Sequence, residues 1–132
     1  MTQLFSLGRY ILDNALFADA PMTKQALAKW LKTSRPTISR YGGIVYYKFS
    51  EFRNDYPELD KSLWAKKGGS RDRNALLTPY QSWVISLIFT SYKCLRNEKA
   101  VGQFLDSNPY IFTKSKYHQE LRKQSSLNQV AI

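Results

Sequence analysis

The stretch SRPTISRY, residues 34–41, decides how the fold of this sequence is interpreted. It follows a helical pattern over residues 24–31, for which Thr23 can act as the N-terminal cap. Ser34 can cap a second helix after the short turn KTS, and Pro36 falls in its first turn, where a missing N–H costs nothing. Two short helices joined by a tight turn predict a helix-turn-helix.

The second helix is expected to have an inward and an outward face. With Ile38 packed inside, Pro36 and Arg40 point directly away from the first helix. Arg40 would then reach a guanine edge, whose O6 and N7 atoms fit the guanidinium fork. The hydroxyls short enough to reach bases or phosphates are those of Ser34, Thr37 and Ser39. The residues of the first helix expected to meet Ile38 are Leu27, Trp30 and Leu31.

A wing is expected directly after this pair. Gly42–Gly43 should stop the second helix, and IVYYKF, residues 44–49, should form a short strand because it is β-branched and aromatic. Side chains alternate along a strand, so Tyr46 and Tyr47 would point to opposite faces. In this interpretation either Tyr46 or Tyr47 would lie on the sugar-phosphate backbone, and Lys48 would pair with a phosphate.

The charge distribution favours an anionic partner. The chain has 132 residues and a formal net charge of +10. Residues 22–53 hold seven Lys or Arg and one Glu, a net charge of +6, which places the helix pair in a basic patch. Residues 66–73 form a second patch within a glycine-split loop. The residues of that loop expected to add phosphate contacts on DNA are Lys66, Lys67, Arg71 and Arg73.

The sequence argues against catalysis and against a bound metal or cofactor. The single cysteine, Cys94, excludes a disulfide framework and a cysteine zinc site within one chain. His118 has no partner cysteine and no obvious dyad partner, and no glycine-rich phosphate loop is present. The longest apolar run, residues 83–89, is far too short to span a membrane, and a reducing cytoplasm is the expected location.

Helical segments surround the basic patch. An amphipathic helix is expected over residues 3–17, and a capping box at Thr78 begins a helix over residues 79–95 that is apolar on more than half its circumference. Such a helix must be covered on two sides, by the shorter helices expected at 99–105 and 114–123 and by a second copy of the chain. The residues expected at a dimer seam are Leu4, Leu7, Ile11, Val84, Ile85, Ile88, Phe89 and Tyr92.

These patterns divide the chain into four segments. The expected segments are an N-terminal helix (1–20), a winged helix-turn-helix (21–65), a basic loop (66–74) and a helical dimerisation region (75–132). The fold class is therefore mainly α with a small β wing. The sequence does not decide between the N-terminal helix and the helix over 79–95 as the dimer seam.

Residues 22–60 resemble the winged helix-turn-helix of MerR-type regulators and their excisionase relatives. The resemblance rests on MTKQALAKWLKTSRPTISRY followed by YYKFSEF. It implies that Ser34 caps the recognition helix, Ser50 caps the next helix and Tyr47 is the wing aromatic. It also implies that Thr37 and Arg40 face DNA and that Ile38 anchors the core. A narrower resemblance is to the small MerR-like repressors encoded beside CRISPR-associated transposons, because of the chain's size, its LLTPYQSWVISLI helix and the missing sensor domain.

This chain departs from the MerR pattern in its short wing, its preceding helix and the lack of a following effector domain, so no small-molecule effector is expected. We expect a homodimeric repressor that binds an inverted repeat in double-stranded DNA, in the cytoplasm and on the nucleoid. The alternatives are an excisionase-like architectural factor and a protein-interaction adaptor. The DNA-binding residues expected outside the 66–74 loop are Ser34, Arg35, Pro36, Thr37, Ser39, Arg40, Tyr41, Tyr47 and Lys48.

Overall fold

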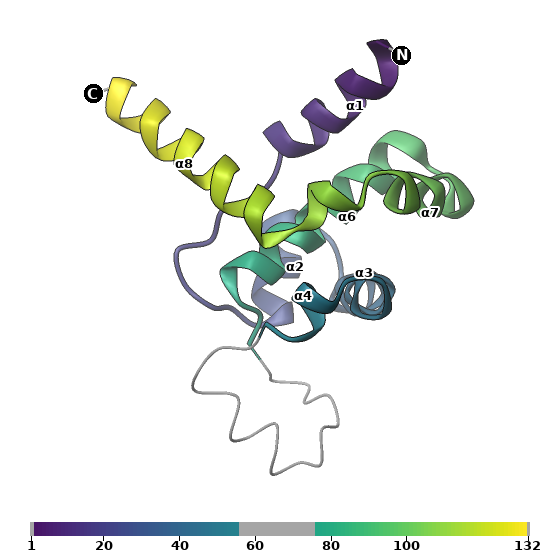
Figure 1. Ribbon diagram of the computed structural model, residues 1–132. Coiled ribbons are helices and arrows are strands. Elements are labelled where there is room, and N and C mark those ends of the chain that lie inside the picture. The colour runs from purple at the N-terminus through teal and green to yellow at the C-terminus, as the bar shows by residue number, and fades with distance from the viewer. Residues whose placement is uncertain (1, 56–75, 132) are drawn as a thin grey trace.

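Helices assemble around one long central helix (Figure 1). The computed structural model describes the backbone of residues 2–55 and 76–131 and the side chains of residues 7–55 and 76–125. Within these ranges the chain is mainly helical, as the sequence predicts, and its extended backbone pairs only in an antiparallel bridge between Met22 and Leu77. The elements are α1 (Thr2–Asp13), α2 (Lys24–Leu31), α3 (Arg35–Lys48), α4 (Ser50–Arg53), α6 (Pro79–Leu95), α7 (Glu98–Ser107), the 3-10 helix η1 (Pro109–Phe112) and α8 (Lys114–Ala131).

The central helix is α6, and its own chain covers it. Its capping box forms as the sequence predicts: the Thr78 hydroxyl accepts a hydrogen bond from the Gln81 N–H, and the Gln81 side chain accepts one from the Thr78 N–H. Every residue from Tyr80 to Ile88 is buried. Helices α1, α3, α4, α7 and α8 all contact α6. The apolar circumference that required cover on two sides is therefore enclosed within a single chain.

Polar contacts fix the start of α6 against α4. The Gln81 side-chain amide donates a hydrogen bond to the Phe52 carbonyl over 2.9 Å. The Thr78 hydroxyl donates to the Asp55 carboxylate. These buried or part-buried groups find partners on the neighbouring helix, as buried polar groups must to avoid the cost of desolvation. They hold the segment that follows α3 in a defined place beside the core.

The α2–α3 pair has the predicted helix-turn-helix connectivity. The Thr23 hydroxyl accepts a hydrogen bond from the Ala26 N–H over 3.1 Å and caps α2. The Ser34 hydroxyl accepts one from the Thr37 N–H over 3.3 Å and caps α3, with Pro36 in its first turn. Both predicted caps are confirmed. The turn between the helices spans residues 32–34, as the sequence predicts.

The predicted wing is wrong. Residues 42–48 continue α3 through both glycines, and the expected strand over 44–49 is not formed. The reason is burial: Ile38, Tyr41 and Val45 recur at helical spacing and are all buried. Each fully buried apolar side chain contributes about 1.5–3 kcal/mol. That gain exceeds the roughly 0.5–1 kcal/mol that a glycine costs inside a helix.

The break after α3 comes at Phe49, seven residues later than the sequence predicts. Phe49 adopts an extended conformation between α3 and α4, and its ring stacks on Phe112 of η1 at a centroid distance of 5.2 Å. The next helix begins at Ser50, but the Ser50 side chain does not cap it, which corrects that predicted role. A tertiary contact of Phe49, rather than a glycine signal, therefore marks the end of α3.

Three further differences separate the observed helices from the expected ones. Trp30 was expected to pack inward, but it is 54% exposed. Helix α1 ends at Asp13 rather than near residue 17, and the extended segment after it still buries Leu16 and Ala18. At the other terminus, α8 runs to Ala131, past the end expected at residue 123.

A glycine substitution tests whether α3 continues through residue 42. In Gly42→Ala the added Cβ would lie 3.8 Å from the Ile85 Cδ1 atom, an ordinary contact. We expect the substitution to raise the free energy of unfolding by about 0.5–1 kcal/mol, because alanine loses less backbone entropy in a helix. Urea denaturation measures the change.

Gly102→Ala in α7 is the matched control, because no heavy atom lies within 4 Å of its added Cβ. It should give a similar gain. If residues 42 and 43 formed a turn before a strand, Gly42→Ala would lower stability while Gly102→Ala would still raise it.

Candidate nucleic-acid interface

Helix α3 presents one exposed ridge on the side away from the core. Pro36, Arg40 and Tyr47 follow one another at intervals of four and seven residues, which places them on a common face at about 100° per residue. All three are exposed, Tyr47 by 74%. On the opposite face, Ile38 and Val45 are both 0% exposed. The core therefore fixes which side of α3 faces solvent.

Arg40 is held on this ridge by two aromatic rings. Its guanidinium carbon lies 5.4 Å from the ring centroids of both Tyr41 and Tyr92. The two rings stack on each other, 4.8 Å apart and inclined by 12°. Cation–π contacts of this kind contribute about 0.5–1 kcal/mol at an exposed site. Within the described residues the Arg40 N–H groups make no hydrogen bond, so the guanidinium edge stays available for a bidentate acceptor.

The sequence did not indicate that Tyr92 supports Arg40. Tyr92 was expected at a dimer seam, but its partly buried ring instead supports Arg40 from α6. Burial, together with the nearby Glu98 carboxylate at the start of α7, raises the pKa of the Tyr92 hydroxyl above its ordinary value. Nothing in the sequence pattern relates positions 40 and 92, which meet only because α3 packs on α6.

The hydroxyl residues gather at the start of α3. The Ser34 and Thr37 hydroxyl oxygens lie 2.8 Å apart and share a hydrogen bond, while Ser39 lies half-exposed one turn after Arg35. Ser34 is exposed, and Arg35 and Thr37 are half-exposed. This end of α3 therefore brings together the predicted short polar side chains.

Two other predicted DNA contacts are placed differently from expectation. Tyr41 is only 6% exposed, because its ring packs beneath Arg40 against Tyr92. Its predicted contact with DNA is corrected to a supporting role. The Lys48 ammonium is paired with the Asp106 carboxylate of α7 over 2.6 Å. Lys48 is therefore near the ridge but already has an anionic partner.

Arg53 of α4 fixes the last turn of α3. Its guanidinium donates a hydrogen bond to the Tyr46 carbonyl over 3.1 Å and lies 6.0 Å from the Tyr46 ring centroid. The Tyr46 ring in turn meets Tyr47 edge to face at 5.1 Å. The sequence marked Arg53 only as one charge in the basic patch. The structure shows it supporting the exposed tyrosine of the ridge.

The remaining predicted site residues fall into two groups. Lys66, Lys67, Arg71 and Arg73, with the whole 66–74 loop, lie outside the described residues, as does the side chain of Leu4. Of the predicted dimer-seam residues, Ile11, Val84, Ile85 and Ile88 are 0% exposed in the single chain, and Leu7, Phe89 and Tyr92 are partly buried. The four fully buried side chains belong to the core of one chain, so a dimer seam would have to involve other residues. The homodimer itself stays a prediction.

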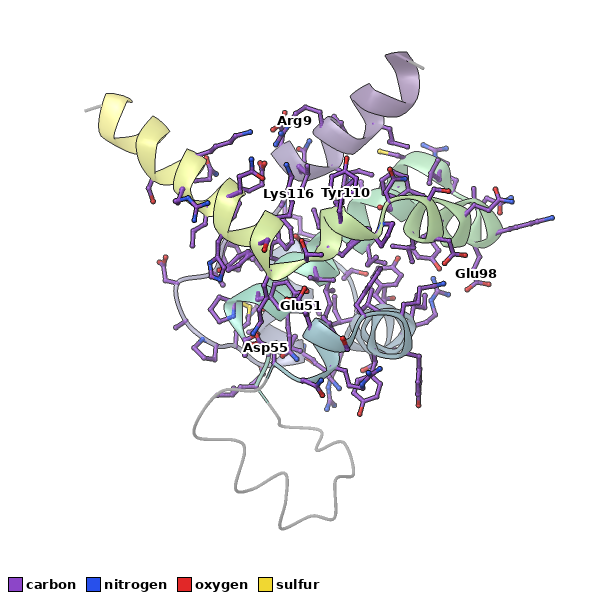
Figure 2. All side chains as sticks on the ribbon, viewed as in Figure 1. Arg9, Glu51, Asp55, Glu98, Tyr110 and Lys116 are labelled. Atoms are coloured by element: carbon purple, nitrogen blue, oxygen red, sulfur yellow. The ribbon has the colours of Figure 1, made fainter. Side chains whose placement is uncertain are left out.

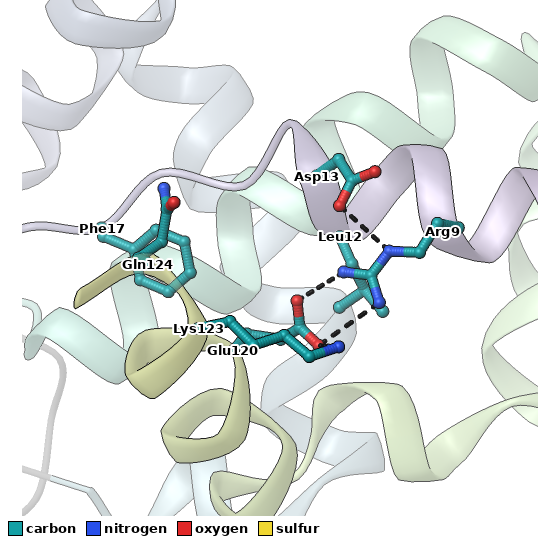
Figure 3. Close-up of a pocket in the computed structure, with 7 residues that line it drawn as sticks. All are labelled: Arg9, Leu12, Asp13, Phe17, Glu120, Lys123 and Gln124. Carbon is teal, nitrogen blue, oxygen red and sulfur yellow. Dashed lines mark hydrogen bonds and ion pairs between the residues drawn. The ribbon is translucent and has the colours of Figure 1, made fainter. Parts of the chain in front are cut away.

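A second feature of the described residues is a groove of about 290 Å³ between α1 and α8 (Figure 3). Its lining residues are Arg9, Leu12, Asp13, Phe17, Glu120, Lys123 and Gln124. Arg9 donates hydrogen bonds to the Asp13 and Glu120 carboxylates. Glu120 is only 5% exposed and also lies 3.3 Å from the Lys116 ammonium and 3.6 Å from that of Lys123.

These charges clamp α1 to α8. Burial by itself would raise the pKa of Glu120, but the hydrogen bonds and charges of Arg9 and Lys116 hold it below the ordinary value of 4.5. The hydrogen bond to Glu120 likewise raises the pKa of Arg9. Because these groups satisfy one another, the groove is explained as a structural contact between the two terminal helices.

Acidic side chains also fix the start of α8, on the side of the molecule that carries α4 (Figure 2). The Glu51 carboxylate accepts a hydrogen bond from the Lys114 N–H over 3.3 Å, and the Lys114 ammonium pairs with the Asp55 carboxylate. The acids of the α4 region thus bind α8 and neutralise one of its cations. The Arg40 guanidinium on the exposed ridge of α3 instead has two aromatic rings as its neighbours.

In the part of the chain that the structure describes, no three His, Cys, Asp or Glu side chains gather as metal ligands. No described helix combines the length and apolarity that crossing a membrane requires. Comparisons of this chain with protein-family models, curated proteins and solved structures gave no match.

The α1–α8 clamp predicts a pH dependence of stability. Because the pKa of Glu120 is lowered in the folded chain, its ion pairs contribute stability above about pH 4.5, and this stability is lost as the pH falls through the folded pKa. Glu120→Gln should lower the free energy of unfolding at pH 7 by about 1–3 kcal/mol and flatten its decline in acid. Denaturant titrations from pH 7 to pH 3 measure both effects.

Asp19→Asn, a change at an exposed carboxylate in the segment after α1, is the control. It should leave the pH profile close to that of the wild type. A Glu120→Gln profile that stays parallel to the wild-type profile in acid would contradict the clamp.

Proposed function

We propose that this protein is a sequence-specific double-stranded DNA-binding protein that represses transcription as a homodimer, with α3 as its recognition helix. The observation that carries the proposal is the exposed Arg40 on the outer ridge of α3, set on a helix-turn-helix whose inner face is locked by Ile38 and Val45. We assign it no catalytic role, cofactor or small-molecule effector, and we place its action on the nucleoid in the cytoplasm.

The dimensions of α3 suit a major groove. Its 14 residues span about 21 Å at a rise of 1.5 Å per residue, and the groove of B-DNA is about 12 Å wide and admits a helix. Arg40 would meet a guanine edge with its guanidinium fork, while Thr37 and Ser39 contact neighbouring bases. Ser34, Arg35 and Tyr47 would contact the sugar-phosphate backbone at the two ends of the helix.

The resemblance to MerR-type regulators remains part of the proposal for the α2–α3 pair only. The role that a wing has in that family would pass to the last turn of α3, where Tyr47 and Lys48 lie. The net charge of +10 supplies the sequence-independent attraction to phosphate on which specific contacts build.

We propose a homodimer because one recognition helix is long enough to contact only one half-site. A single helix-turn-helix reads one half-site, and two copies bind half-sites one helical turn apart, at about 34–36 Å. An inverted repeat that overlaps a promoter would then be blocked by the bound dimer.

Selection of binding sites from random duplexes, followed by footprinting on the selected site, tests the proposal. A repressor dimer should select and protect one inverted repeat. Protection of several direct repeats with a bent duplex would indicate the excisionase-like architectural role instead. DNA affinity without any dependence on salt, or no affinity, would overturn the proposal and favour a protein-interaction adaptor.

Arg40→Ala tests the recognition residue. We expect a loss of about 1–3 kcal/mol in binding to the selected site and a relaxed preference at one base pair, because the bidentate contact to guanine is removed. Fluorescence anisotropy with the selected duplex and with single-base variants measures both. Urea denaturation should show a loss of stability no larger than about 2 kcal/mol from the two aromatic contacts.

Arg122→Ala on the exposed surface of α8 is the matched control for the loss of one positive charge. It should leave the base preference unchanged. If Arg40→Ala kept both the affinity and the base preference of the wild type, α3 would not be the recognition helix.

A further inference from the structure

Helix α7 brings acidic residues to the basic helix α3. The Asp106 carboxylate, in the last turn of α7, lies 2.6 Å from the Lys48 ammonium, in the last turn of α3. At the other end of α7, the Glu98 carboxylate contributes to the raised pKa of the Tyr92 hydroxyl. The ring of Tyr92 supports Arg40. The two helices are joined through α6, which contacts both.

The spacing of these charges is the same on both helices. Arg40 and Lys48 are eight residues apart in α3, and Glu98 and Asp106 are eight residues apart in α7. Because the rise per residue is common to all α-helices, the two acids have the axial separation of the two cations, about 12 Å. Asp106 therefore pairs directly with the cation in the last turn of α3, and Glu98 lies near the Tyr92 hydroxyl at the other end of α7.

The Lys48–Asp106 pair is too exposed to be explained by stability. The side chains are 34% and 69% exposed, and ion pairs at such exposed positions contribute little to stability. The pair nevertheless neutralises the cation that the last turn of α3 would offer to a phosphate. Opening this ion pair costs little free energy, so the main effect of the pair is to weaken the attraction of α3 for an anion.

We propose that Asp106 restrains the DNA affinity of this protein by competing with DNA phosphate for Lys48. The inference rests on the proposed DNA-binding function and adds a residue that tunes it. Since phosphate contacts are the same for every sequence, the restraint acts on all duplexes alike and leaves base preference to Arg40. It lowers the occupancy of non-specific DNA, on which a basic chain would otherwise be held.

The test is the binding of the full chain to a short, fluorescently labelled duplex of mixed sequence over a series of salt concentrations. Asp106→Asn should bind roughly twofold to fivefold more tightly at low salt, because an exposed ion pair no longer competes for Lys48, and the slope of log affinity against log salt should steepen by about one, because one more phosphate is neutralised. The midpoint of urea denaturation should change little, because an exposed ion pair contributes little to stability.

Asp13→Asn is the matched control, since Asp13 is 61% exposed and also paired with an arginine, on α1. It removes the same charge away from α3 and should change the affinity little when the Debye length is about 10 Å.

The double variant Lys48→Ala with Asp106→Asn separates competition from general repulsion. Without Lys48, the Asp106→Asn change should give little or no gain. Wild-type DNA binding with no gain in Asp106→Asn, or a full gain in the Lys48→Ala background, would overturn this inference and leave the proposed function standing. Absence of salt-dependent DNA binding by the wild type would overturn both the proposed function and this inference.

Discussion

The burial of α6 on every side is the constraint on which the rest of this structure depends. Trp83, Val84, Ile85, Leu87 and Ile88 are all 0% exposed, so helices must pack around the whole circumference of α6. Helix α3 meets this demand by turning its apolar side to α6, and that orientation fixes the rotation of α3 about its own axis. The exposed ridge with Arg40 is therefore a consequence of core packing, and the candidate interface has the rigidity of the core behind it.

Local signals predict this fold where a side chain acts on its own backbone. The caps at Thr23, Ser34 and Thr78 form as predicted, because each depends only on residues two or three positions away. The wing failed for the opposite reason. Gly42–Gly43 and the β-branched run after it have weak helix propensity, but propensity is a small term that the burial of Val45 outweighs. The helical spacing of Ile38, Tyr41 and Val45 was visible in the sequence, yet nothing local showed that α6 would cover them.

The candidate site could be predicted only in part for a related reason. Composition counts cations but does not show which of them are paired within the chain. Lys48 is paired with Asp106, Lys114 with Asp55, and Arg9 with Glu120, and each pair joins residues more than fifty positions apart. Arg40 differs because its partners are aromatic rings, which hold the guanidinium in place and leave its hydrogen-bond donors free. The distinction between a neutralised and an available cation thus depends on tertiary contacts that net charge does not reveal.

The same burial changes how dimerisation has to be understood. If α6 had needed a second copy to cover it, folding and association would be one event, and any change at the seam would unfold the chain. Because one chain buries Val84, Ile85 and Ile88 completely, a homodimer would have to join through other residues. Under the proposed function, association would be weak in the free protein and strengthened on DNA, where two half-sites would hold two copies at a fixed separation. The cations of α3 would then set how often a single copy stays on non-specific DNA, and the restraint proposed for Asp106 would favour pairs on an operator over single copies elsewhere.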